Sequence, residues 1–354
     1  MTAKLLLCSR PICSIPSNFY AFHVYLKPFS SISSFSIEGI ETQLKSLCKN
    51  PNPQYSEAFS LFDRSVDSNL VPSELVCNFL IGNLRKAKLY DLVVSVYCKM
   101  SLINVLPRFN SLSCLVESFV NTEKPTFAVA VLGMMIKRGF EINKYNVNLI
   151  LKGFCRNSNT KKAMDLFLHM RRNDILPDRI SYNTLINGLC KAKKLKEARD
   201  LFMEMKLEDC QPDLVTYTTL IDGLSKNDRV DEAFDLLKEM DQKGLDADVV
   251  VYSALINGFC NRGGIHRAKE LFHEMLKKGI SPNVVTYSCF MHSLSKNGQW
   301  QEASEMFDEM TSRGIYPDVI AYTVLINGLC KNGMALKAMQ LLNLMVQKGE
   351  SQIL

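Results

Sequence analysis

The chain has 354 residues, of which 47% are hydrophobic and 22% are charged, so it holds ample material for folded structure. Length alone suggests two or three globular domains. The first 36 residues contain three of the 42 basic residues and none of the 36 acidic ones, which leaves a net charge of only about +3 on the remainder. This small net charge therefore gives no strong argument for nucleic-acid binding.

The first 36 residues differ in composition from everything that follows. They carry Lys4, Arg10 and Lys27 without a compensating acid, and they are rich in serine, as in "SSISSFS" from Ser30 to Ser36. This composition predicts a cleaved organellar transit peptide over residues 1–36, with a disordered tail as the alternative. The apolar run "LLL" is too short for a secretory signal, and no stretch is long and apolar enough to span a membrane.

The rest of the chain is organised by a repeat of 35 residues. The segment "SYNTLINGLCK" at Ser181 to Lys191 recurs in outline four more times, with its tyrosine at regular intervals. A fixed period of this length indicates a solenoid, in which each unit buries its apolar face against its neighbours. Residues 37–73 resemble a degraded first unit. The predicted repeats begin at Glu74, Phe109, Lys144, Arg179, Leu214, Val249, Val284 and Val319, and the last is incomplete.

Each repeat contains two amphipathic segments joined by a short turn. In the unit Arg179 to Asp213, the apolar residues fall at the i, i+3, i+4 and i+7 spacing of a helix face in both segments. A proline followed by Asp or Asn closes most units, and it both discourages helix continuation and supplies an N-cap for the next helix. The sequence therefore predicts an all-α solenoid of antiparallel helix pairs.

Small residues recur at two positions of the first helix. Glycines occupy one of them, at Gly153, Gly188, Gly223, Gly258 and Gly328, which suggests close helix approach because glycine is costly inside a helix. Cys155, Cys190, Cys260 and Cys330 share the other position with serines. No Cys-x-x-Cys pair occurs among the twelve cysteines, so we interpret them as packing residues in a reducing compartment and predict no metal and no cofactor.

The 35-residue pattern, of the form "YNTLINGLCKxxxxxEAxxLFxEMxxxGxxPD", strongly resembles the pentatricopeptide repeat family in its P-type form. The resemblance covers residues 74–354 and implies a right-handed superhelix that binds single-stranded RNA, one base per repeat. The tetratricopeptide pattern, with its 34-residue period and Trp-x-x-Leu-Gly motif, is absent. Units such as "KYNVNLILKGFC" are similar to the restorer-of-fertility-like group, which implies a plant mitochondrion, with the chloroplast as the alternative.

The resemblance assigns base recognition to the fifth and last residues of each repeat. Asn, Thr and Ser at the fifth position are mediocre helix formers that offer hydrogen-bonding groups, although these groups could instead bond within the helix or to a neighbouring helix. The Asp or Asn at the last position would also be favoured as a helix cap. The predicted recognition residues are Ser113, Asn143, Asn148, Asp178, Asn183, Asp213, Thr218, Asp248, Ser253, Asn283, Ser288, Asp318 and Thr323.

Two further columns complete the predicted RNA surface. The second residue of each repeat is expected to sandwich a base, and seven of the eight are apolar or aromatic. Leu75 is one of them, and the predicted sandwiching residues are the other six: Tyr145, Ile180, Val215, Val250, Val285 and Ile320. Asn110 departs from this pattern. At the thirteenth position, cations could contact phosphates or could compensate the helix dipole: Lys86, Arg156, Lys191, Lys226, Lys296 and Lys331.

The family code converts the recognition pairs into an RNA sequence. Ser with Asn implies A, Asn with Asp implies U, and Thr or Ser with Asp implies G, so repeats two to seven imply a core near 5′-AUUGAG-3′, with C as a substitute for U. The pair Asn78 and Arg108 cannot be read. The last repeat has Thr323 but Ile353 where Asp or Asn belongs.

The sequence lacks the motifs of an enzyme of this kind. No His-x-Glu and Cys-x-x-Cys pair of a zinc deaminase occurs, and there is no separate segment with clustered carboxylates for a nuclease. We therefore predict a non-enzymatic binder of organellar RNA with no membrane and no small-molecule substrate, which supports RNA processing, stabilisation or translation by occupancy and by recruiting nuclease or ribosomal factors. The alternative is a protein-interaction scaffold of the tetratricopeptide type.

Overall fold

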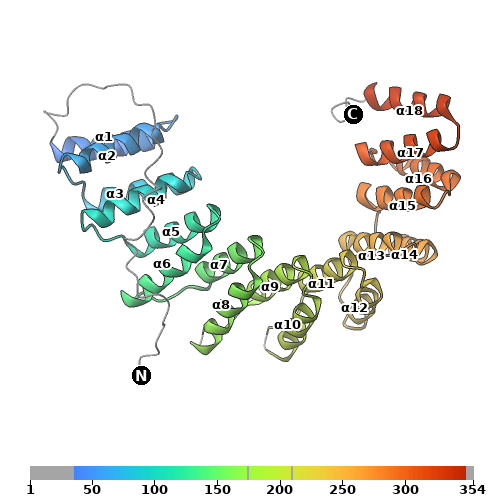
Figure 1. The fold of residues 1–354 in the computed structure, drawn as a ribbon, viewed down its shortest axis with the longest axis horizontal. Helices are drawn as coiled ribbons and strands as arrows, with labels where there is room; N and C mark the ends of the chain where they lie inside the picture. Colours follow the sequence, from blue (N-terminus) through green and yellow to red (C-terminus); the bar gives the residue numbers. More distant parts are fainter. Residues whose placement is uncertain (1–35, 174, 209, 348–354) are drawn as a thin grey trace. The chain divides into compact units, whose positions relative to one another are not determined.

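The computed structural model describes residues 36–173, 175–208 and 210–347, and within these ranges the chain forms eighteen helices and no strands. Consecutive helices are joined by short turns into pairs (Figure 1). The prediction of an all-α fold of helix pairs is confirmed. Residues 1–35 of the predicted transit peptide, and Ile353, lie outside these ranges. Within them, no helix combines the length and the apolar character that a membrane span requires.

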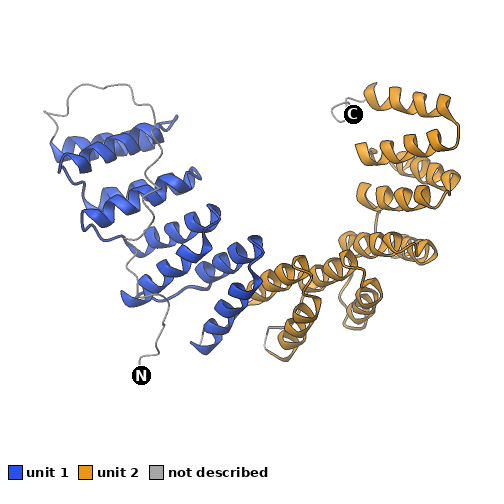
Figure 2. Ribbon diagram, in the orientation of Figure 1, with its two compact units in different colours: residues 1–177 blue, residues 178–354 orange. Residues whose placement is uncertain are grey.

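The chain divides into two compact units, residues 1–177 and 178–354 (Figure 2). In the first unit, α1 pairs with α2 within the predicted degraded repeat, and the first helices α1, α3, α5 and α7 pack in succession. The helices of this unit are α1 (Ile37–Lys49), α2 (Tyr55–Asp67), α3 (Glu74–Lys86), α4 (Tyr90–Leu102), α5 (Phe109–Asn121), α6 (Pro125–Lys137), α7 (Lys144–Arg156) and α8 (Thr160–Arg172).

The second unit contains five helix pairs, and its first helices α9, α11, α13, α15 and α17 also pack in succession. In both units, every predicted repeat start is the first residue of a helix. The helices of the second unit are α9 (Arg179–Lys191), α10 (Leu195–Leu207), α11 (Leu214–Lys226), α12 (Val230–Gln242), α13 (Val249–Asn261), α14 (Ile265–Lys277), α15 (Val284–Lys296), α16 (Trp300–Ser312), α17 (Val319–Lys331) and α18 (Ala335–Gln347).

In three successive repeats of the second unit, the tyrosine of the first helix joins the two helices of its repeat. The rings of Tyr217 and Tyr252 are fully buried, and their hydroxyls donate to carboxylates of the second helix, Glu239 at 2.5 Å and Glu274 at 2.8 Å. Tyr287 contacts Glu309 in the same way. Because a buried hydroxyl must find a partner, this bond fixes the register of one helix on the other. The recurring tyrosine is thus a structural residue.

Close approach of successive first helices explains the glycine position. A methyl group added at Gly258 would lie 2.9 Å from the Val230 Cγ2 atom and 3.0 Å from the Ser225 Cβ atom, and one added at Gly223 would collide with Cys190. Similar crowding surrounds Gly153 and Gly328. The prediction of close approach is confirmed, and at Gly223 and Gly258 the glycine packs against the small Cys or Ser of the preceding repeat.

We expect Gly258→Ala to destabilise the protein by about 1–3 kcal/mol, because overpacking at a rigid contact outweighs the better helix propensity of alanine. Gly82→Ala is the matched control, since an added methyl group there meets no atom within 4 Å. That control should stabilise the protein by up to about 1 kcal/mol. Thermal unfolding followed by circular dichroism measures both effects, and equal shifts for the two variants would contradict the close-approach explanation.

The Tyr252 hydrogen bond should make stability depend on alkaline pH. Burial, together with the carboxylate of Glu274 and against the charge of Lys278, raises the pKa of Tyr252 to about 12 from an unfolded value of about 10. The stabilisation that this raised pKa represents is complete below pH 10 and is lost as the pH rises through 12.

Tyr252→Phe should therefore cost about 1 kcal/mol at neutral pH. It should also flatten the fall of the unfolding free energy between about pH 10 and 12. Denaturant titrations across this pH range measure both effects. Tyr316→Phe, at a tyrosine that is 79% exposed, is the control and should leave the alkaline slope unchanged.

Candidate nucleic-acid interface

The last residue of each readable repeat is the N-cap of the next first helix. The Asp213 Oδ1 atom accepts from the Thr216 backbone N–H at 3.0 Å and from the Thr216 hydroxyl at 2.9 Å, while the Asp213 N–H is directed at that hydroxyl oxygen. The predicted capping role is thus observed, because this bond satisfies an N–H that the helix cannot. The other caps of this kind are Asn143, Asp178, Asp248, Asn283 and Asp318.

One cap carries an additional ion pair. The Arg179 guanidinium lies 3.5 Å from the second carboxylate oxygen of Asp213. Although partial burial opposes ionisation, the bonds from Thr216 and the charge of Arg179 hold the pKa of Asp213 below its ordinary value. The carboxylate therefore stays ionised at neutral pH and acts as an acceptor.

The serines at the fifth position contact either the following cap or the helix that this cap begins. The Ser288 hydroxyl donates to the Asp318 Oδ1 atom at 3.1 Å, so the structure brings together the two predicted recognition residues of this repeat. In two other repeats the partner is the third residue of the next first helix: Ser253 contacts the Thr286 hydroxyl at 2.7 Å, and Ser113 accepts from the Asn146 amide at 3.0 Å. The alternative of bonds to a neighbouring helix is therefore realised at these positions.

The threonines bond within their own helices. The Thr218 hydroxyl donates to the Leu214 carbonyl at 2.7 Å, and Thr323 donates to the Val319 carbonyl at 2.7 Å. Each hydroxyl oxygen keeps acceptor capacity that could face another group. Asn183 differs from them, because its Oδ1 atom is buried and has no hydrogen-bond partner among the described residues. Asn148, at the same position of the preceding repeat, is 8% exposed.

The second residues form an exposed apolar column. Their exposed fractions run from 50% at Val250 to 62% at Ile180, and the neighbouring first helices each present one such side chain. Apolar groups held this open to solvent can contact the faces of flat ligands. The members of this column are Tyr145, Ile180, Val215, Val250, Val285 and Ile320.

The cations of the thirteenth position are exposed and lie at the opposite end of the first helix. Eight residues separate the fifth position from the thirteenth, which corresponds to about 12 Å along the helix axis. Lys226 forms an ion pair with Asp222 at 2.7 Å. Each cation is the last residue of its helix, so helix-dipole compensation and phosphate contact both remain compatible with its place: Lys86, Arg156, Lys191, Lys226, Lys296 and Lys331.

The cysteines and histidines have packing and surface roles. Burial raises the pKa of Cys190 to about 12, as it does that of Cys260, so both thiols stay protonated at neutral pH. His266 is exposed and lies 3.4 Å from Glu270, four residues further along the same helix. Across residues 36–173, 175–208 and 210–347, no three His, Cys, Asp or Glu side chains are grouped as a metal site would require.

The third residue of the repeat was missed as part of this surface. Ser181, Thr216 and Thr286 each complete a capping box, and Thr286 also contacts the fifth residue of the preceding repeat. The signal was present in the sequence as the small polar residue before each tyrosine. It had no assigned role because its partners, the fifth and last residues, belong to the preceding repeat.

Comparison with known proteins agrees with the repeat pattern. The model of the PPR repeat family matches residues 145–191, 177–226, 212–261, 247–296, 282–331 and 317–351, which together make up more than half of the chain. A pentatricopeptide repeat-containing protein of Arabidopsis thaliana is 46% identical over 119 residues, or 33% of this chain and 16% of that protein. A second from the same plant is 31% identical over 115 residues, or 32% of this chain and 17% of that protein.

The chain thus spans about a sixth of the length of these two relatives. Two others, both 30% identical, are named as mitochondrial. Among solved structures, the pentatricopeptide repeat protein PPR10 in complex with an 18-nt psaJ RNA element aligns with 91% of this chain and 52% of its own, at 17% identity and a TM-score of 0.63. This likeness supports the repeat fold, and the family model supports the sequence pattern. The chain belongs to the PPR repeat family.

Proposed function

We propose that the protein binds single-stranded RNA in a sequence-specific manner, with one base per repeat. The observation that carries the proposal is the recurrence of one arrangement on the first helices from α7 to α17. Each presents an exposed apolar second residue near a polar fifth residue, in an unbroken 35-residue step. A regular row of apolar and polar groups suits a polymer whose units each have a flat face and a hydrogen-bonding edge.

Each column has a distinct task in this proposal. The second residues contact base faces, the fifth and last residues meet base edges, and the cations of the thirteenth position neutralise phosphates. These cations lie about 12 Å along the helix axis from the fifth residues. An RNA strand whose bases meet the fifth residues and whose phosphates meet the cations would therefore lie across the first helices. The unpartnered Oδ1 atom of Asn183 supports the scheme, since a base edge with an N–H donor would relieve its burial without a partner.

The proposed RNA core is 5′-AUUGAG-3′, and the protein acts on it by occupancy. A covered segment can be shielded from nucleases, or presented to processing or ribosomal factors. We place the protein in mitochondria, as the names of two relatives suggest, with the chloroplast as the alternative and the restorer-of-fertility-like group as its proposed subgroup. The proposed role is non-enzymatic.

We expect residues 36–354 to bind an RNA containing AUUGAG more tightly than a scrambled RNA of equal composition, as measured by fluorescence anisotropy. Thr218→Asn would pair an asparagine with Asp248, which reproduces the combination of Asn183 and Asp213. It should shift the preference at the fourth base from G to U by roughly 5- to 100-fold, the value of about 1–3 kcal/mol for a good base-edge contact.

Thr219→Asn is the matched control for this substitution. Thr219 is the next residue of α11, and its hydroxyl makes the same type of bond, to the Val215 carbonyl at 2.7 Å. The control should leave the base preference unchanged. Equal affinity of the wild-type protein for both RNAs would reject base-by-base reading, and no RNA binding by a folded sample would favour the protein-interaction scaffold.

A salt series separates the two explanations of the cation column. If Lys191 contacts a phosphate, Lys191→Gln should weaken binding to all RNAs alike and reduce the slope of log affinity against log salt by about 0.7. If Lys191 only compensates the dipole of α9, the slope stays constant and stability falls by up to about 1 kcal/mol. Lys196→Gln, at an exposed lysine of α10, is the control with the same charge change.

A further inference from the structure

The repeat from Glu74 to Arg108 departs from the others at its last residue. Arg108 occupies the N-cap of α5, where the six repeats that follow in the described chain have Asp or Asn. A guanidinium carries only donors, so it cannot accept from the free N–H groups of the helix, and Arg108 makes no capping bond through its side chain. The start of α5 therefore needs an acceptor from elsewhere.

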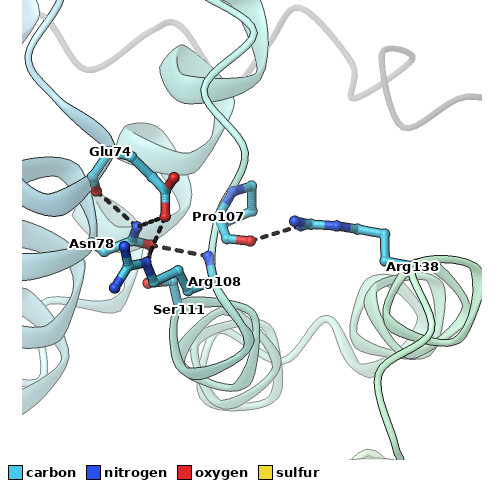
Figure 3. Close-up of polar contacts among 6 residues, drawn as sticks. All are labelled: Glu74, Asn78, Pro107, Arg108, Ser111 and Arg138. Carbon is cyan, nitrogen blue, oxygen red and sulfur yellow. Dashed lines mark hydrogen bonds and ion pairs between the residues drawn. The ribbon is translucent and has the colours of Figure 1, made fainter.

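Asn78, the fifth residue of the same repeat, accepts from two other groups at this helix start, the N–H of the N-cap residue and the hydroxyl of the third helical residue. Its Oδ1 atom accepts from the Arg108 backbone N–H at 3.2 Å and from the Ser111 hydroxyl, as Figure 3 shows. In regular repeats the hydroxyl of this third residue bonds to the cap itself, as Thr216 does to Asp213. Asn78 thus accepts the hydroxyl bond that Arg108 cannot accept, and it also accepts from the cap N–H, which in regular repeats points at the third-residue hydroxyl.

The other half of the Asn78 amide is also occupied. Its Nδ2 atom donates to the Glu74 carbonyl at 2.7 Å and lies 3.4 Å from the Glu74 carboxylate. The oxygen has two donors for its two lone pairs, so the group has little left to offer a base. Asn183, at the same position of a regular repeat, has a buried oxygen with no partner among the described residues.

An ion pair holds Arg108 in this arrangement. The Arg108 Nε atom lies 2.6 Å from the Glu74 carboxylate, and Arg138 donates to the Pro107 carbonyl at 2.7 Å, just before the cap (Figure 3). The repeat from Arg179 to Asp213 has the same two positions with the charges exchanged. There the last residue is Asp213, whose carboxylate can accept hydrogen bonds, whereas the Arg108 guanidinium can only donate them.

We propose that Arg108 closes this repeat to base selection. It removes the acceptor from the last position, and by leaving α5 without a side-chain cap it commits Asn78 to the protein. The repeat then accepts any base, and the sequence that is read begins at Ser113. This inference rests on the proposed RNA-binding function, and it deepens it by assigning the 5′ limit of the recognised sequence to Arg108.

The test is the double variant Glu74→Val with Arg108→Asp, which installs residue types found at these positions in other repeats. The introduced aspartate should cap α5 and release Asn78, giving the same pair of side chains as Asn183 and Asp213. With the four RNAs NAUUGAG, the wild-type protein should bind all within about twofold, and the variant should prefer U at N by roughly fivefold or more. Glu74→Val with Arg108→Ala is the matched control and should remain unselective.

A second measurement is independent of RNA. Asn78→Ala should lower the Tm of the wild-type protein by about 2–4 °C, because it removes both bonds that Asn78 accepts at the start of α5. It should have a smaller effect in the Glu74→Val, Arg108→Asp background, where the introduced aspartate is the cap. Equal shifts in both backgrounds would overturn the capping exchange.

The RNA results have equally definite meanings. Selection at N by the wild-type protein would overturn the proposal, as would an unselective double variant that still prefers AUUGAG to the scrambled RNA. If the wild-type protein shows no preference for AUUGAG over the scrambled RNA, the proposed function is rejected, and the role of Arg108 in base selection is rejected with it. The Tm comparison would still decide whether Asn78 replaces the missing acceptor at the start of α5.

Discussion

The capping bond at the junctions between the regular repeats is the constraint on which the rest of the surface depends. A first helix has N–H groups at its start that find no partner within the helix, and Asp213 supplies an acceptor to Thr216 at 3.0 Å. The same residue is also the last residue of its repeat. A group that we propose for base recognition is thus held in place by its capping bond, which fixes its position without a bound ligand. Pre-organisation of this kind lowers the cost of ordering the site on binding.

Two other contacts fix the register and the spacing of the helices from one repeat to the next. The buried hydroxyl of Tyr252 ties the first helix of its repeat to Glu274 on the second, and the crowding at Gly258 sets how closely one first helix approaches the next. Both contacts recur at 35-residue intervals in neighbouring repeats. A packed interior resists small changes in volume. The helix register that these contacts set therefore leaves little freedom in the spacing of the proposed base-recognition residues.

Much of this architecture could be predicted from the sequence because it depends on local patterns. The periodicity located the first helices, and the proline-Asp junction indicated the caps. The partners of the polar side chains could not be predicted in the same way. Ser288 contacts Asp318 thirty residues later, and Asn78 contacts both Arg108 and Ser111, so each bond depends on how two helices are packed. The role of the third residue was missed for the same reason.

Such bonds also imply that the repeats do not contribute equally to recognition. A base that engages Ser288 competes with the bond to Asp318, and one that displaces the Thr218 hydroxyl competes with a helix carbonyl. Only the difference between the bond made and the bond given up adds to affinity. Asn183 gives up no bond at its buried oxygen, so a donor that reaches this atom gains more than it would at Ser288. Discrimination should therefore be greatest where the free protein leaves an acceptor unsatisfied, and weakest where the fifth residue already has a partner.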